Sequence, residues 1–323
     1  MPLSTRLTEY FGVKYPIISA PMAMASGGVL AAAVSRAGGL GLIGGGYGDV
    51  HWLDQQFEAA GNQSVGCGFI TWSLRKNPSL LDGVLSRRPK CLFLSFDDPE
   101  PFASLSHAQG IPVICQIQTV KDAARAIEVG AEVIVAQGSE AGGHGEKRST
   151  FTLVPEVADL IAAKSADTIL CAAGGVADGR GIAAALMLGA DGVVVGSRFW
   201  ASAEALVHPR MHQAAIAANG DDTVRSRVMD IVRAIEWPER FTARVLRNSF
   251  IDKWHGNEAK LHTHIADEAR RWQEAWTDGD VTVANTFVGE AVGLIHTIQP
   301  VQEIIEQLTN EAEGTIRAHG KGI

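Results

Sequence analysis

The sequence predicts an α/β fold of the (β/α)8 TIM-barrel class with a late helical insertion. Short apolar runs recur eight times before Ser197, and most gaps between them have the periodicity of amphipathic helices. The runs are nearly continuous in hydrophobicity, which is typical of parallel strands buried on both faces. After Ser197 this alternation of strand and helix stops. Eight strand–helix units in succession favour a closed barrel followed by a different kind of segment.

The expected strands and helices follow one another in strict order. We expect strands at residues 17–21, 40–45, 64–70, 91–96, 112–117, 133–138, 168–175 and 192–197. We expect helices at residues 28–37, 78–86, 101–109, 120–129, 154–163 and 179–188, with a less regular helix near 53–60. A doubly wound open sheet is the structural alternative. Because no G-x-G-x-x-G follows the first strand, a dinucleotide-binding version of that sheet is disfavoured.

The segment from residue 199 to 288 lacks the regular alternation of strand and helix, and it contains most of the tryptophans. We interpret it as helical, with helices that include 223–233 and 264–276, and we expect a final helix over 289–314. Residues 1–198 with 289–323 then form the barrel, and 199–288 form a cap domain over its mouth. The alternative is that residues 199–288 form an accessory helical layer that is remote from any functional site. Whether Trp200, Trp237 or Trp254 lines a pocket stays open.

Composition and charge exclude several classes of function. The net charge is −8 and no basic block occurs, which argues against nucleic acid or an anionic membrane as a partner. Four cysteines without a C-x-x-C pair favour buried free thiols in a reducing compartment. No signal-peptide pattern or long apolar run occurs, so we expect a cytoplasmic protein. His262 and His264 lack a third ligand cluster, so we expect no metal.

Candidate functional residues lie where the expected strands end, because barrel enzymes place their sites at that end. Gly174 and Gly175 end the seventh expected strand, and Gly196 and Ser197 end the eighth. Such turns bind phosphate through backbone amides. His144 lies between two glycines after the sixth strand, and imidazole exchanges protons near neutral pH. The pattern therefore predicts a phosphate-bearing ligand beside a proton-handling residue.

Several motifs together resemble one family. ISAPMA, AGGLG, AQGSEAGGH, AAGGVADGRG and GADGVVVGSRF occur in this order, followed by GEAVGLIHTIQPVQEIIEQL near the C-terminus. The combination, spread over residues 8–310, resembles the nitronate monooxygenase family, formerly called 2-nitropropane dioxygenases. The resemblance implies a TIM barrel that binds FMN without a covalent link, with a helical substrate domain inserted late in the chain.

The resemblance also implies roles for individual residues. Pro21, Met22 and Ala23 would border the isoalloxazine ring, and His144 matches the family's catalytic histidine. The complete set expected to bind the cofactor is Ala20, Pro21, Met22, Ala23, Gly68, Gln116, Gln137, Gly142, Gly143, Ala173, Gly174, Gly175, Val194, Val195, Gly196 and Ser197. Where many members have G-V-N, this chain has Gly66-Cys67-Gly68, so Gly68 offers only its backbone there.

The function that these residues imply is FMN-dependent oxidation of alkyl nitronates or nitroalkanes by dioxygen, giving carbonyl compounds and nitrite, with His144 as base. An NAD(P)H-dependent FMN reductase of quinones or enoyl thioesters is the nearest alternative. A non-redox barrel that binds a sugar phosphate, or a flavin-binding protein without turnover, is a second alternative from another class. The physiological substrate and the oligomeric state, a homo-oligomer included, stay open.

Overall fold

The computed structural model describes residues 3–319 and shows a barrel of eight parallel strands. The strands are β1 (Ile17–Ser19), β2 (Leu42–Gly46), β3 (Gly66–Ile70), β4 (Leu92–Ser95), β5 (Val113–Ile117), β6 (Val133–Gln137), β8 (Ile169–Ala173) and β9 (Gly192–Val195). The helices between and after them are α2 (Gly28–Arg36), α3 (Val50–Ala60), α4 (Thr71–Leu74), α5 (Ser79–Ser86), α6 (Phe102–Ala108), α7 (Val120–Glu128), α8 (Thr150–Lys164), α9 (Gly179–Met187), α10 (Ser197–Trp200) and α16 (Val301–His319).

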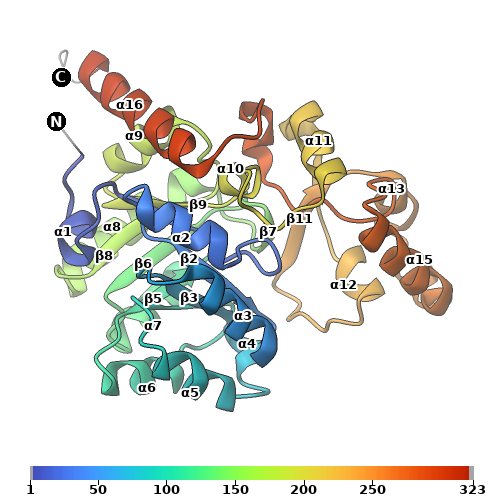
Figure 1. The fold of residues 1–323 in the computed structure, drawn as a ribbon, viewed down its shortest axis with the longest axis horizontal. Coiled ribbons are helices and arrows are strands. Elements are labelled where there is room, and N and C mark those ends of the chain that lie inside the picture. The colour runs from blue at the N-terminus through green and yellow to red at the C-terminus, as the bar shows by residue number, and fades with distance from the viewer. Residues whose placement is uncertain (1–2, 320–323) are drawn as a thin grey trace.

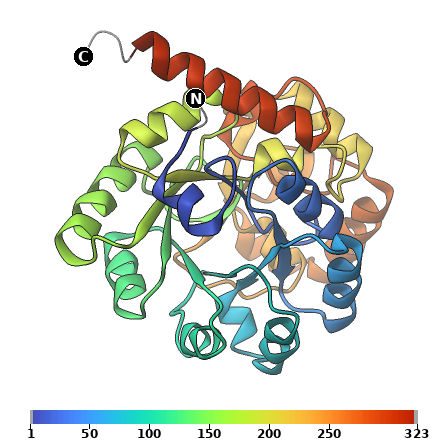
Figure 2. The same ribbon diagram turned by 60° about the vertical axis from the view of Figure 1, so that its left-hand side comes forward.

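Hydrogen bonds around Leu40 close the sheet into a barrel. The paired strands run in the order β1-β9-β8-β6-β5-β4-β3-β2. Leu40, just before β2, forms a parallel bridge with Ile18 of β1, and its carbonyl accepts a hydrogen bond from the Ser19 N–H. The helices form an outer ring around the strands (Figure 2). The predicted barrel is therefore confirmed.

Two apolar layers hold the barrel together, as expected for strands buried on both faces. Inside the barrel, alternate strand residues such as Ile18, Phe93 and Val135 form one cluster. Leu7 of α1 (Arg6–Phe11) joins this cluster and packs against Gly192 at the start of β9, so α1 covers the end where the strands begin. The strand residues between these, whose side chains point away from the barrel interior, pack against the surrounding helices. The open end of the barrel is therefore the end where the strands finish.

The later part of the chain folds beside that open end (Figure 1). Its elements are α11 (Pro209–Ala217), η1 (Gly220–Asp222), β10 (Thr223–Ser226), α12 (Val228–Val232), β11 (Thr242–Leu246), α13 (Ser249–Trp254), α14 (Glu258–His262), α15 (Ile265–Asp278) and η2 (Glu290–Leu294). β10, β11 and the short β7 (Gly143–Gly145) form an antiparallel sheet of three strands. This sheet joins the late segment to the loop that carries His144.

Two predictions for this region are wrong. The expected helix at 223–233 is a strand followed by a short helix, because β-branched Thr223 and Val224 pair with β11 and this pairing overrides the local helical pattern. The expected helix at 289–314 begins only at Val301. Pro300 directly precedes it, and a proline disfavours helical backbone in the residue before it, so this helix does not extend back past Pro300. Residues 289–300 contain only the short 3-10 helix η2. The helix expected at 264–276 is confirmed as α15.

The four cysteines match the expectation of buried free thiols. Cys67, Cys91, Cys115 and Cys171 are free and buried. Burial raises the pKa of the Cys67 thiol to about 12, so this thiol stays protonated at neutral pH. None of the helices in residues 3–319 is both long and apolar enough to cross a membrane.

Candidate active site

A cavity of about 350 Å³ opens where the barrel strands end. Residues at the ends of all eight barrel strands, or directly after them, form its floor, and residues of the late segment form its roof. Of the residues predicted to bind a cofactor or to act in catalysis, those that line the cavity are Ala20, Pro21, Met22, Ala23, Gly68, Gln116, Gln137, Gly142, Gly143, His144, Ala173, Gly174, Gly175, Val194, Gly196 and Ser197.

Val195 is the one residue of the predicted set that does not line the cavity. Its side chain is fully buried among residues that pack between the strands and the surrounding helices. Val194, its neighbour, points into the barrel instead and lies in the inner cluster. Side chains alternate along a strand, so two successive valines of β9 face opposite layers.

The glycine turns after β8 and β9 present unpaired backbone donors to the cavity. Gly174 and Gly175 have φ values of 99° and 79°, which side-chain-bearing residues rarely adopt. In the described chain, the N–H groups of Gly175, Gly196 and Ser197 have no protein acceptor. Ser197 uses its hydroxyl to accept a hydrogen bond from Gly289 N–H at 2.8 Å. Free N–H groups at the ends of two neighbouring strands, on residues that line the cavity, fit a phosphate.

His144 lies on β7, where its backbone pairs with Ala243 of β11. Its Nε2 lies 3.0 Å from both carboxylate oxygens of Asp230 on α12. The side chains are 9% and 4% exposed, so the pair is buried. Burial lowers the pKa of His144, and the hydrogen bond with Asp230 opposes that shift. The imidazole is therefore neutral at pH 7, with Nε2–H donated to Asp230.

Trp237 covers the other side of the imidazole. Its ring stacks on His144 with the centroids 3.5 Å apart and the planes 7° from parallel. Trp237 Nε1 donates a hydrogen bond to Tyr47 Oη at 3.0 Å, which fixes the indole from the barrel side. Arg240 forms ion pairs with Asp122 and Glu146, and these hold the loop after Trp237 against the barrel. The imidazole can therefore move little.

Gln137 on β6 ties the His144 backbone to the neighbouring strand. Its Nε2 donates to the His144 carbonyl at 3.2 Å, and its Oε1 accepts from Gln118 at 2.7 Å and from Gln116 at 3.2 Å. Gln137 and Gln118 are 8% and 2% exposed, so their buried polar groups rely on one another as hydrogen-bond partners. Gln137 therefore positions the His144 loop as well as lining the cavity.

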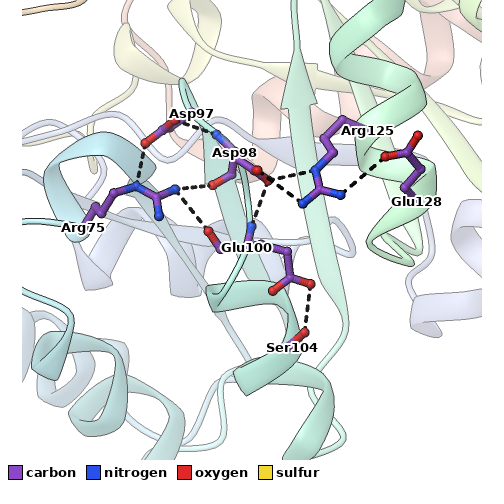
Figure 3. A network of polar contacts seen from close by, with 7 residues as sticks. All are labelled: Arg75, Asp97, Asp98, Glu100, Ser104, Arg125 and Glu128. Atoms are coloured by element: carbon purple, nitrogen blue, oxygen red, sulfur yellow. Dashed lines mark hydrogen bonds and ion pairs between the residues drawn. The ribbon is translucent and has the colours of Figure 1, made fainter.

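The loop after β4 brings Phe96 to the same histidine. Phe96 has φ 72° and its ring meets the His144 ring edge-to-face at 6.4 Å. Figure 3 shows the polar network that holds the residues after it. Arg75 binds the Asp97 carboxylate at 2.9 Å, and Arg125 binds the Asp98 carboxylate at 3.1 Å. Two arginines from different elements thus anchor the loop that orients Phe96.

We expect an Asp98→Asn substitution to lower the free energy of unfolding by up to about 1 kcal/mol at pH 7, because exposed ion pairs contribute little. Burial opposes ionisation of Asp98, but hydrogen bonds from Arg125 and from the Glu100 N–H lower its pKa overall. A depressed native pKa stabilises the fold above the unfolded pKa of about 3.9. Urea unfolding should therefore show a difference between wild type and variant at pH 7 that shrinks as the pH falls below about 4. A difference that grows on acidification would contradict this assignment.

The residues that sequence reasoning missed come mostly from the late segment. Trp200 and Trp237 line the cavity, whereas Trp254 does not. Asp230 interrupts the apolar run VMDIV and is 3% exposed, so a carboxylate within an apolar helix was the available signal. In residues 3–319, no group of three or more His, Cys, Asp or Glu side chains is placed to hold a metal ion.

Comparison with known proteins identifies the family. The model described as nitronate monooxygenase matches residues 4–62 and 75–311. The chain belongs to the nitronate monooxygenase family. It is therefore a flavin oxidoreductase of the nitronate monooxygenase kind. The family model passes over residues 63–74, which contain the departure at Gly66-Cys67-Gly68.

A curated relative agrees with this membership, and two solved structures agree with the fold. A nitronate monooxygenase of Neurospora crassa is 35% identical, over 97% of this chain and 93% of its own. The structure of FabK from Thermotoga maritima superposes with a TM-score of 0.87 at 31% identity, covering 99% of both chains. A nitroalkane oxidase from Streptomyces ansochromogenes has a TM-score of 0.80 at 23% identity, with 97% and 99% covered, and shares the fold.

Proposed function

We propose that this protein oxidises alkyl nitronates, or the parent nitroalkanes, with FMN and dioxygen to give carbonyl compounds and nitrite. The observation that carries the proposal is the buried His144–Asp230 pair on the wall of a cavity whose floor is built from glycine turns. The family membership supports it. Residues 1–198 with 289–323 act in this proposal as the flavin-binding barrel, and residues 199–288 as the substrate-binding cap.

The residues of the cavity floor fit FMN. Free N–H groups at Gly175, Gly196 and Ser197 suit its phosphate, and the wall of Pro21, Met22 and Ala23 suits a flat ring system. A Cβ at Gly68 would lie 2.5 Å from the Pro21 ring, so only glycine lets that wall form. Bound FMN supplies the redox chemistry between substrate and dioxygen. The protein supplies orientation and proton transfer.

His144 takes the α-proton of a neutral nitroalkane through Nδ1. Both contacts with Asp230 use Nε2, and no partner of Nδ1 is found within residues 3–319. With Nε2–H donated to Asp230, the lone pair of Nδ1 is the basic position. Asp230 stabilises the imidazolium that forms when the proton arrives. A preformed nitronate needs no such step, so only the neutral substrate depends on this base.

A Gly196→Ala substitution is expected to weaken FMN binding by about 10- to 100-fold, an effect similar in size to that of one charge-assisted hydrogen bond. The backbone N–H remains, but the new methyl group would lie 3.6 Å from Ala20 Cβ and 4.0 Å from Met22 Sδ, both cavity-lining residues, and would take up space where the phosphate is expected to bind. FMN fluorescence titration measures the dissociation constant. Gly314→Ala on α16 is the control, because a Cβ there meets nothing within 4 Å. Unchanged FMN affinity of the Gly196 variant would refute the phosphate site.

The test of the proposed function compares two assays of the FMN-loaded protein. Oxygen uptake and nitrite release with the nitronate of nitroethane, without flavin bleaching by NADH or NADPH in the absence of air, support the proposal. Fast anaerobic bleaching by either nucleotide without nitronate turnover instead supports the alternative, an NAD(P)H-dependent reductase of quinones or enoyl thioesters.

A further inference from the structure

Tyr47 follows β2, and contacts with both its backbone and its ring hold it at the cavity wall. Ser73 Oγ donates a hydrogen bond to the Tyr47 carbonyl at 3.1 Å. The Tyr47 ring meets the Trp72 ring edge-to-face at 6.1 Å and the Trp237 ring at 6.3 Å. Tyr47 also lines the cavity. The side chain therefore has one defined position beside the space that a substrate would occupy.

The Tyr47 hydroxyl is a hydrogen-bond donor without an acceptor in the described chain. Its oxygen accepts the Trp237 Nε1–H at 3.0 Å. An indole nitrogen only donates, so this contact does not use the phenolic hydrogen. Within residues 3–319, no acceptor for that hydrogen is found. The hydrogen is therefore available to a ligand in the cavity that Tyr47 and Trp237 both line.

The hydroxyl keeps its proton at neutral pH. Burial raises the pKa of Tyr47, and the charge of Arg233 opposes that shift. The Arg233 guanidinium carbon lies 5.5 Å from the Tyr47 ring centroid and 5.7 Å from that of Trp272, so the cation is held beside the phenol. Asp230 also raises the pKa of Tyr47, but its carboxylate is engaged by His144. A neutral phenol beside a cation is a strong donor, because the positive charge favours electron density on the phenolic oxygen.

Trp237 connects this donor to the proposed base. One face of its ring stacks on His144, and the Nε1 edge of the same ring binds Tyr47. The base and the donor thus surround one indole, and both line one cavity. In a nitroalkane, only the nitrogen separates the nitro oxygens from the α-carbon. One small molecule can therefore present its α-hydrogen to His144 and a nitro oxygen to Tyr47.

We propose that Tyr47 is a second catalytic residue, whose O–H donates a hydrogen bond to a nitro oxygen of the substrate while His144 removes the α-proton. This rests on the proposed function for the identity of the substrate. In this step the α-carbon–hydrogen bond breaks, the proton moves to Nδ1 of His144, and the electron pair moves onto the nitro group. Tyr47 keeps its own proton. A donor aimed at an oxygen that gains negative charge stabilises the transition state more than the neutral substrate.

Exchange of the α-protons of nitroethane in deuterium oxide tests this donor without any oxidation. NMR follows the loss of the α-proton signal with the FMN-loaded protein in the absence of dioxygen, and protein-free buffer is the blank. We expect wild type to accelerate the exchange, and Tyr47→Phe to slow the catalysed exchange by about 10²-fold, the usual effect of removing one oxyanion donor.

Binding of 2-methyl-2-nitropropane separates this catalytic role from a structural one. This probe carries a nitro group but no α-proton, so it binds without reacting. Its dissociation constant, measured by isothermal titration calorimetry, should change by no more than about threefold in Tyr47→Phe, because a neutral hydrogen bond contributes little net affinity. Tyr10→Phe on α1 is the matched control, since it removes the same hydroxyl from a side chain that is 49% exposed. Exchange and probe binding should both be normal in that variant.

Slowed exchange in Tyr47→Phe with retained probe binding supports the donor. Unchanged exchange in Tyr47→Phe, slowed exchange with equally weakened probe binding, or a wild type that does not accelerate exchange overturns it. Nitrite assays on the same preparations separate the two proposals. Exchange that depends on Tyr47, without nitrite from nitroethane or its nitronate, supports the donor and rejects the oxidation. Nitrite release with exchange that does not depend on Tyr47 supports the oxidation and rejects the donor.

Discussion

Replacing His144 by alanine is expected to lower kcat/KM for a neutral nitroalkane by about 10²- to 10⁴-fold, the usual contribution of a general base. Turnover of the preformed nitronate should fall far less, because that anion has already lost its α-proton. His144 is neutral because burial lowers its pKa, and its hydrogen bond to Asp230 orients the ring. The ring stacks on Trp237, and one ring nitrogen is left to accept the α-proton. Steady-state oxygen uptake with nitroethane and with its nitronate measures both values.

His144→Gln is the matched control for this experiment. Alanine leaves the Asp230 carboxylate buried without its partner, which destabilises the cap. Glutamine keeps an N–H group for Asp230 but has no basic nitrogen. Both variants should therefore lose nitroalkane turnover, while the glutamine variant keeps a thermal midpoint closer to that of wild type. Equal losses with nitroethane and its nitronate in the glutamine variant would remove the base role from His144.

Asp230→Asn is expected to lower kcat/KM for the neutral nitroalkane by about 10- to 100-fold, part of the general-base contribution. Burial lowers the pKa of His144, and Asp230 opposes that shift through its hydrogen bond and charge. Asparagine still accepts Nε2–H but carries no charge, so the pKa of His144 falls further. A weaker base transfers the proton more slowly, and the imidazolium that forms lacks its counter-charge.

The pH profile distinguishes this positioning role from a structural one. The base acts when neutral, so activity with nitroethane rises as pH increases through the pKa of His144. In Asp230→Asn this rise should move to lower pH while the plateau falls, and the nitronate reaction should change little. A lower plateau with an unmoved rise would indicate that Asp230 only supports the fold of α12.

Much of the barrel and of the cavity floor was predictable from sequence, because both depend on local patterns. Continuous apolar runs predict the strands, and Gly174, Gly175 and Gly196 mark strand ends where a barrel opens. His144 was recognisable because it lies in such a turn. Val194 and Val195 were both expected to bind the cofactor, and only Val194 lines the cavity; a motif does not show which of two neighbouring side chains faces inward.

The roof of the site could not be predicted, because its residues meet only through long-range pairing. Asp230 lies 86 residues after His144 and reaches it because β10 and β11 form a sheet with β7. β10 of that sheet was expected to be part of a helix, but its pairing with β11 overrides weak local preferences. The sequence by itself determined the barrel, the glycine turns and the histidine, which are encoded in contiguous residues. The tertiary structure decided the partner of that histidine, the Trp237 stack and the contact of Arg233 with Trp272, because each requires segments that are distant in the chain to pack together.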